Sequence, residues 1–189
     1  MHWSHRRSAV LAVLVVATAG LVSACTPQAP PQAAAPKQDP VARGRYLTTI
    51  MSCNDCHTPG YFYGMPDTTR RLSGSDVGWV GPWGVVHARN LTPDSTGIGA
   101  WSAEEIVATL RTGSTPDHAQ LAPIMPWGNY GDLTDEDAYA IAAYLKSLPP
   151  IHHVNLPRIP PGEPATGANV PFPPPPAWDV PVGAAPAGH

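Results

Sequence analysis

The stretch Cys53-Asn54-Asp55-Cys56-His57 decides how the rest of the chain is interpreted. Its C-x-x-C-H pattern is the attachment signature of a c-type haem. Cys53 and Cys56 are three positions apart, so on one helical turn both thiols can form thioethers with the vinyl groups of a haem. His57 follows at once and is placed to be the proximal iron ligand. The alternatives are a chance match and a C-x-x-C pair that binds zinc or exchanges disulfides.

The composition describes a compact middle with extended ends. The 189 residues suffice for one ordinary domain with tails, or for two very small domains. The 25 prolines are far above the average usage of about 5%, and they cluster towards both ends. The net charge is −3 and there is no basic stripe, which excludes nucleic acid as a partner. The chain has three cysteines, of which only Cys25 lies outside the motif, so a disulfide framework is also excluded.

Residues 1–24 have the pattern of an export signal. Arg6 and Arg7 precede an apolar run, which ends in Val22-Ser23-Ala24-Cys25. This ending resembles the lipobox of bacterial lipoproteins, which implies cleavage before Cys25 and lipid attachment to it. An ordinary secretory signal or a retained membrane helix is the alternative. Residues 25–38, rich in Pro and Ala, are predicted to be a tether, so we expect an exported protein, lipid-anchored to a membrane, with its domain facing the periplasm or the cell exterior.

The predicted domain covers residues 39–150, and its helices are indicated by capping residues. The predicted helix starts are Asp39-Pro40, Ser102 with Glu105 as its capping-box partner, and Thr134 followed by three acidic residues. The stretch between the motif and Ser102 is predicted to be an irregular loop packed on the edge of a haem. Residues 151–189 are predicted to be a Pro-rich tail, either extended chain or a segment that covers the domain or docks a partner.

In this order the motifs resemble a class I c-type cytochrome with one haem. The resemblance is closest to the cytochrome c modules associated with bacterial periplasmic dehydrogenases, and it implies an all-α fold of three to four helices around one covalent haem. It also implies that Gly44 lies against the last helix near Tyr144. Besides the C-x-x-C-H motif, the resemblance depends on the strings Asn90-Leu91-Thr92-Pro93-Asp94, Trp101-Ser102, Met125-Pro126-Trp127 and Leu133-Thr134-Asp135-Glu136-Asp137 through Tyr144-Leu145-Lys146-Ser147-Leu148-Pro149-Pro150.

The sixth position of the iron has several candidate ligands. Met51 is too close to the motif in sequence to reach the opposite face of the haem, whereas Met65, in a glycine-rich loop, can. Met125 lies in a Pro-stiffened loop shortly before the last helix, where the resemblance places the distal methionine. We therefore expect His57 and Met125 as the two metal ligands, with Met65, a second histidine or an open site as alternatives.

The surroundings of the haem are less specific in the sequence. His57 is expected to donate its other ring N–H to a backbone carbonyl, and the resemblance offers Pro82 as the acceptor. It also aligns Asn90 and Trp101 with residues that face a haem propionate. Further candidates near a propionate are Trp79, Trp83, Arg89 and Trp127.

These patterns predict an electron carrier that is not itself an enzyme. A haem with two axial ligands has no position for a substrate, so the chemistry is one-electron transfer between redox partners. By resemblance, the donor is a periplasmic or membrane dehydrogenase and the acceptor a respiratory cytochrome or oxidase. The alternatives are a haem sensor or enzyme with a labile sixth ligand, and a structural subunit that wires a larger complex.

Overall fold

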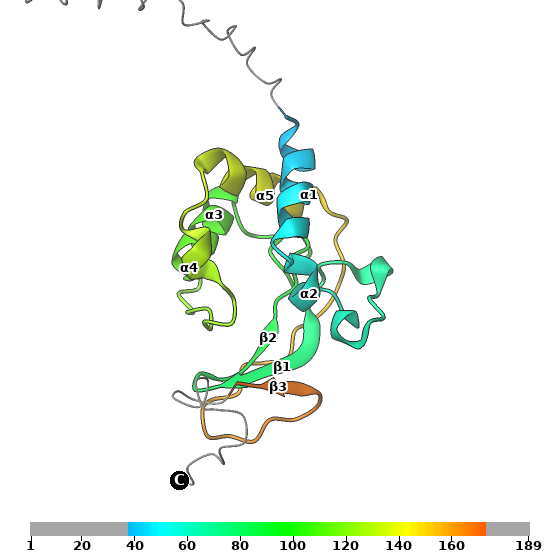
Figure 1. Ribbon diagram of the computed structural model, residues 1–189, viewed down its shortest axis with the longest axis vertical. Coiled ribbons are helices and arrows are strands. Elements are labelled where there is room, and N and C mark those ends of the chain that lie inside the picture. The colour runs from blue at the N-terminus through cyan, green and yellow to red at the C-terminus, as the bar shows by residue number, and fades with distance from the viewer. Residues whose placement is uncertain (1–37, 173–189) are drawn as a thin grey trace, which may run out of the picture. The chain divides into compact units, whose positions relative to one another are not determined.

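A computed structural model describes residues 38–172 of the chain, and its elements are labelled in Figure 1. In chain order they are α1 (Pro40–Ile50), α2 (Cys53–His57), the 3-10 turns η1 (Tyr61–Tyr63) and η2 (Thr68–Arg70), β1 (Ser75–Gly81), β2 (Gly84–Ala88), α3 (Ala103–Thr112), α4 (Trp127–Tyr130), α5 (Asp135–Ser147) and β3 (Asn169–Pro171). The predicted leader, tether and Cys25 lie outside the described residues, as do residues 173–189 of the predicted tail.

The three helix starts predicted from capping residues are confirmed. Asp39 accepts hydrogen bonds from the first-turn N–H groups of α1. The Ser102 hydroxyl and the Glu105 carboxylate form a reciprocal capping box at the start of α3. Thr134 caps α5 by accepting from the N–H of Asp137.

Helices α1 and α5 cross in direct contact, and Gly44 is the reason that they can. A Cβ atom at Gly44 would lie 1.9 Å from the carbonyl oxygen of Ala140 and 2.7 Å from Cβ of Tyr144. Only glycine therefore permits this approach of two backbones. The predicted position of Gly44 against the last helix is confirmed, and the buried hydrophobic core lies around this crossing and α3.

The expectation of an all-α fold is wrong, because residues 75–88 form a β-hairpin. Strands β1 and β2 pair antiparallel, and β3 pairs parallel with the other edge of β1, giving the order β2-β1-β3. The hairpin segment is rich in Val and Trp, which favour strands, whereas the prediction for this stretch is an irregular loop. The parallel partner is about ninety residues away in sequence, a separation at which local patterns carry no signal.

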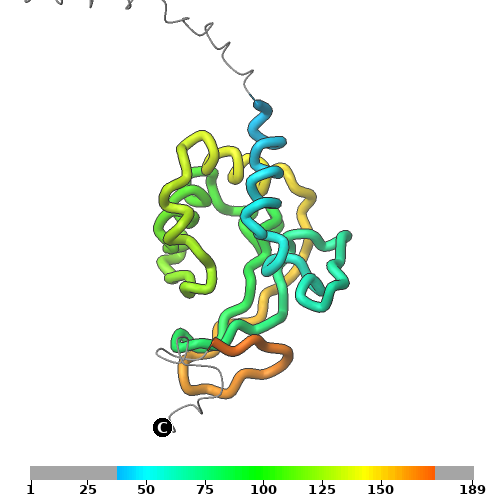
Figure 2. Tube along the Cα trace, viewed as in Figure 1, coloured from blue at the N-terminus to red at the C-terminus, as the bar shows by residue number. Residues whose placement is uncertain are grey.

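Residues 151–172, which we call the C-terminal strap, continue along the hairpin (Figure 2). Ile159 and Val85 exchange two backbone hydrogen bonds of 2.9 and 3.0 Å, and the N–H of Phe172 donates to Val80. The side chain of Phe172 lies beside Trp79 and Trp83. The described fold therefore extends beyond Pro150, and the strap pairs with β2 at Ile159 and with β1 through β3.

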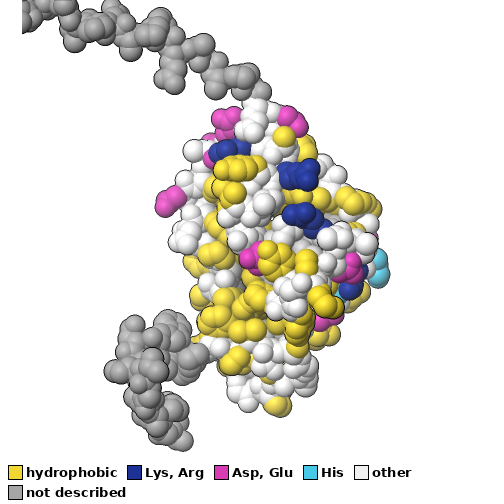
Figure 3. Space-filling view, turned by 45° about the vertical axis from the view of Figure 1, so that its right-hand side comes forward, with side chains coloured by type: hydrophobic (Ala, Val, Ile, Leu, Met, Phe, Trp, Pro, Cys, Tyr) yellow, Lys and Arg dark blue, Asp and Glu magenta, His cyan; other side chains and the backbone are white. Residues whose placement is uncertain are grey.

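Large hydrophobic side chains also reach the surface directly after α2. Tyr61, Phe62, Tyr63 and Met65 are all exposed, and Phe62 still contacts Trp79 edge to face at 4.9 Å between ring centres. In the space-filling view, hydrophobic side chains gather over the lower half of one face (Figure 3). Among residues 38–172, no helix has the length and apolarity needed to cross a membrane.

Candidate functional site

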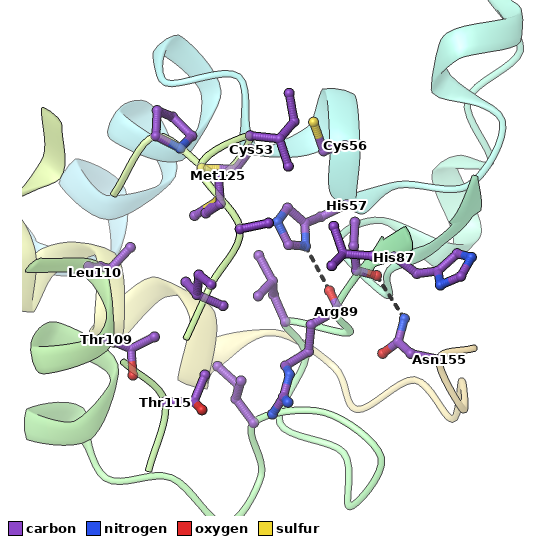
Figure 4. Close-up of a pocket in the computed structure, with 18 of the residues that line it drawn as sticks. Cys53, Cys56, His57, His87, Arg89, Thr109, Leu110, Thr115, Met125 and Asn155 are labelled. Carbon is purple, nitrogen blue, oxygen red and sulfur yellow. Dashed lines mark hydrogen bonds between the residues drawn. The ribbon is translucent and has the colours of Figure 1, made fainter. Parts of the chain in front are cut away.

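A cavity of about 570 Å³ lies between the helices, the hairpin and the strap. This volume is within the range of about 300–1,000 Å³ that small-molecule and cofactor sites occupy. Most of the side chains around it are apolar, and those labelled in Figure 4 come from α2, β2 and the residue after it, α3, the loop before α4 and the strap. The predicted residues Cys53, Cys56, His57, Trp101 and Met125 line this cavity.

The two motif cysteines are presented by α2, a short helix that begins after a tight turn. Ser52 precedes it in the left-handed conformation, with φ of 58°, and this interrupts the helix between α1 and α2. Both thiols are free and half-buried. Burial raises the pKa of Cys53 to about 11 and also raises that of Cys56, so both are neutral thiols at pH 7.

His57 is almost fully buried, with 8% of its surface exposed, and one ring nitrogen is already engaged. Its Nδ1 lies 2.7 Å from the carbonyl oxygen of Arg89. Since a carbonyl can only accept, Nδ1 carries the hydrogen, and burial lowers the pKa of His57, which keeps the ring neutral. The Nε2 lone pair of such a ring is available to a metal.

The expected hydrogen bond from His57 to a backbone carbonyl is therefore confirmed, but the acceptor is Arg89. Pro82, which the resemblance offered, lies instead in the turn between β1 and β2. The hairpin explains the difference, because it carries Pro82 away and returns the chain through β2 to Arg89. Because the sequence analysis did not predict the hairpin, the spacing of residues could not identify the Arg89 carbonyl as the acceptor.

The methionines divide clearly by position. Met125 is half-buried at the cavity, and Figure 4 shows it at the same end as Cys53 and His57. Its backbone is held on both sides, because its N–H donates to Ala122 and its carbonyl accepts from Trp127. Met51 also lines the cavity, whereas Met65 does not and is 78% exposed. Of the two loop methionines, only Met125 lines the cavity, and its role as a ligand stays a prediction.

Asn90 and Trp101 occupy different settings. Asn90 is fully buried and does not line the cavity, and its amide bonds Thr92, Thr96 and the carbonyl of Ile151. Through these bonds the Asn90 side chain joins the loop after β2 to the strap. Its role near a haem propionate stays a prediction. Trp101 does line the cavity, and the Arg89 guanidinium lies 5.2 Å from its ring centre.

Three of the cavity residues that the sequence did not reveal belong to the strap. Asn155, Leu156 and Arg158 all line the cavity, and Arg158 also donates to the carbonyl of Trp83 at 2.9 Å. No motif marks them, since they follow the last predicted helix in a stretch whose composition resembles that of a tail. Only the return of the chain along the hairpin brings them to the site.

The residues present fit a covalently held haem. Two thiols and a neutral histidine with a free Nε2 lie at one end of an apolar cavity, which is the donor set that haem c requires. Cys53, Cys56 and His57 would hold the group on one side, and Met125 is placed to reach it from the loop before α4. The hydroxyl of Thr109 lines the same cavity and has no hydrogen-bond partner among the described residues.

Comparison with known proteins finds cytochromes among the relatives of this chain. The chain is 34% identical to the fructose dehydrogenase cytochrome subunit of Gluconobacter japonicus over 77% of its own length and 28% of that protein's. It is 40% identical to a diheme cytochrome c-type protein of Cereibacter sphaeroides, over 58% of this chain and 36% of that protein. It is 35% identical to the cytochrome c subunit of the quinone alcohol dehydrogenase of Komagataeibacter europaeus, over 62% and 26%. No family model matches the chain.

The similarity supports a c-type cytochrome. Several homologues of the chain are cytochrome subunits of dehydrogenases. The chain spans about a quarter to a third of the length of these curated relatives.

Proposed function

We propose that the chain is a c-type cytochrome that carries single electrons from a dehydrogenase to a respiratory acceptor. The observation that carries this proposal is the convergence of Cys53, Cys56, His57 and Met125 on one apolar cavity. The similarity to cytochrome subunits of dehydrogenases supports a redox protein as the donor. The C-x-x-C-H motif occurs once in the sequence, so we propose one haem per chain.

His57 and Met125 are proposed as the two axial ligands. When bound, a haem supplies reversible one-electron chemistry at its iron. His57 is oriented for this by the Arg89 carbonyl, and the thioether of Met125 is a weak donor that favours the reduced state. With both positions filled by the chain, none would remain for a substrate, and the mostly apolar lining suits the macrocycle of a haem. The chain then acts as a carrier and leaves bond-making to its partner.

The proposed location follows from the leader. Lipid attached to Cys25 would anchor the protein to a membrane, and residues 25–38 would tether the domain outside the cytoplasm, where haem attachment of this kind takes place. A partner dehydrogenase at the same membrane would then encounter the domain by diffusion in the plane of that membrane.

The decisive experiment replaces the proposed sixth ligand. We expect the purified ferric protein to show the sulfur–iron charge-transfer band, and Met125→Ala to lose it while the covalent haem is retained. The matched control is Met65→Ala, which removes an exposed methionine away from the cavity and should leave the band intact.

Carbon monoxide provides the second readout. It should bind the ferrous Met125→Ala protein and fail to bind the wild type, because a stable methionine ligand keeps the position closed. A band that survives Met125→Ala would contradict this methionine as the ligand. Binding of carbon monoxide to the wild type would instead favour a sensor or enzyme with a labile sixth ligand.

A further inference from the structure

Asn155 makes a two-point contact with the backbone segment that holds His57. Its Nδ2 donates to the carbonyl of Ala88 at 2.7 Å, and its Oδ1 accepts from the N–H of Asn90 at 2.8 Å. The two partners decide the orientation of the amide, since a flipped side chain would set donor against donor and acceptor against acceptor. Asn155 thus bridges the residues on either side of Arg89.

The carbonyl between those two anchor points is the one that accepts from His57. The 2.7 Å bond from Nδ1 of His57 to the oxygen of Arg89 and the bond from Asn155 to Ala88 are the two dashed lines in Figure 4. With the Ala88 carbonyl and the Asn90 N–H both engaged, the Arg89 peptide has little freedom to rotate. The direction of its carbonyl, and hence the orientation of the imidazole, depends on Asn155.

Asn155 is itself held in place by the strap on both sides. The backbone of Ile151 exchanges hydrogen bonds with the Thr92 hydroxyl, and Ile159 pairs with Val85. Gly74 leaves the room that the amide needs, because a Cβ there would lie 2.6 Å from Nδ2 of Asn155 and 2.8 Å from the Ala88 oxygen. Gly74 also donates its N–H to the carbonyl of His57 at 2.8 Å. The contact is therefore built into the fold from several directions.

We propose that Asn155 is a positioning residue for the proximal ligand, and that through the Arg89 carbonyl it tunes the affinity of the haem site for an electron. This inference rests on the proposed haem function. A histidine whose second N–H is firmly bound by an oriented acceptor is a more basic ligand and favours ferric iron. Loosening the acceptor should weaken that preference and raise the reduction potential.

The test compares three variants as loaded holoproteins. Asn155→Ala removes both contacts, while Asn155→Asp keeps the acceptor for Asn90 and replaces the donor to Ala88 with an oxygen. Asn169→Ala is the matched control, because it removes an exposed strap asparagine whose amide bonds only the nearby Gly167 carbonyl among the described residues. Haem content and circular dichroism check that each variant is folded.

Two measurements test the role of Asn155: the ferrous-to-ferric ratio of the iron and the solvent exchange of the His57 Nδ1–H. We expect Asn155→Ala to shift the ferrous-to-ferric ratio at a fixed applied potential about tenfold towards ferrous, which equals about 59 mV for a one-electron couple. In Asn155→Asp the added carboxylate opposes this rise, so its potential should lie below that of Asn155→Ala. By NMR of the ferrous protein, the Nδ1–H of His57 should exchange with solvent at least about tenfold faster. Asn169→Ala should match the wild type in both measurements.

The outcomes separate this inference from the proposed function. Wild-type potential and exchange in both Asn155 variants would overturn the positioning role and leave the cytochrome assignment standing. An equal shift in Asn169→Ala would also overturn it, because the effect would then belong to the strap as a whole. A wild-type protein that carries no covalent haem would overturn the proposed function and this inference with it.

Discussion

Gly44 shows how a single position decides whether two elements can meet. A methyl group there would clash with the Ala140 backbone, which has no flexible side chain to move aside. We expect Gly44→Ala to lower the free energy of unfolding by about 2 kcal/mol, since overpacking costs about 1–3 kcal/mol and the gain in helix propensity of about 1 kcal/mol offsets only part of it. Urea unfolding of the holoprotein measures the change.

Gly128 provides the matched substitution. It also lies in a helix, α4, but a Cβ there meets no heavy atom within 4 Å. Gly128→Ala should be neutral or stabilising by up to about 1 kcal/mol. If both variants lose the same amount, the clash between α1 and α5 is not the cause.

At the scale of elements, α1 and α5 are also joined by an ion pair. Arg43 donates from Nε to Oδ1 of Asp137 at 2.8 Å and from the guanidinium terminus to Oδ2 at 3.2 Å. The hydrogen bond from Arg43 holds the pKa of Asp137 below its ordinary value. Its stabilisation is therefore present above the unfolded pKa of about 3.9 and is lost as pH falls through the folded pKa.

Asp137→Asn should thus destabilise the protein by about 0.5–1 kcal/mol at pH 7, because both partners are partly exposed. The difference from wild type should shrink below about pH 4, where the wild-type carboxylate becomes protonated. Urea unfolding at pH 7 and at pH 3 measures both values, with the exposed Asp132→Asn as control. A difference that grows on acidification would contradict the assignment.

At the scale of the whole molecule, the strap completes both the sheet and the cavity. Truncation after Pro150 removes β3, the Val85–Ile159 pairing and the cavity residues Asn155, Leu156 and Arg158. We expect it to lower the thermal midpoint by on the order of 10 °C or more and to reduce the yield of haem-loaded protein.

Truncation after Phe172 is the control for that experiment. It keeps every contact that the described residues make with one another. The difference in thermal midpoint between the two truncations therefore measures the contribution of residues 151–172. Equal midpoints for both truncations would show that residues 151–172 contribute no stability.

The features that the sequence determined by itself are local. Each helix start depends on a side chain and a backbone N–H two or three residues apart, as at Ser102 and Glu105, and the C-x-x-C-H motif needs one helical turn. The contact of Gly44 with the last helix and the ligand role of Met125 were predicted from the family resemblance. The ligand role of Met125 stays a prediction.

Only the tertiary structure decided the sheet, the Arg89 carbonyl and the junctions at Asn90 and Asn155. The β1–β3 pairing and the bonds His57–Arg89, Asn90–Ile151 and Asn155–Ala88 join residues that lie about thirty to ninety positions apart. A strand or an amide presents the same local pattern whichever partner it finds. The predicted all-α fold failed first at the local hairpin of residues 75–88, whose Val and Trp residues favour strands. The third strand of the sheet then comes from a segment whose prolines indicated a tail. Short-range sequence patterns specified the haem motif, and long-range pairing placed the strap beside the cavity.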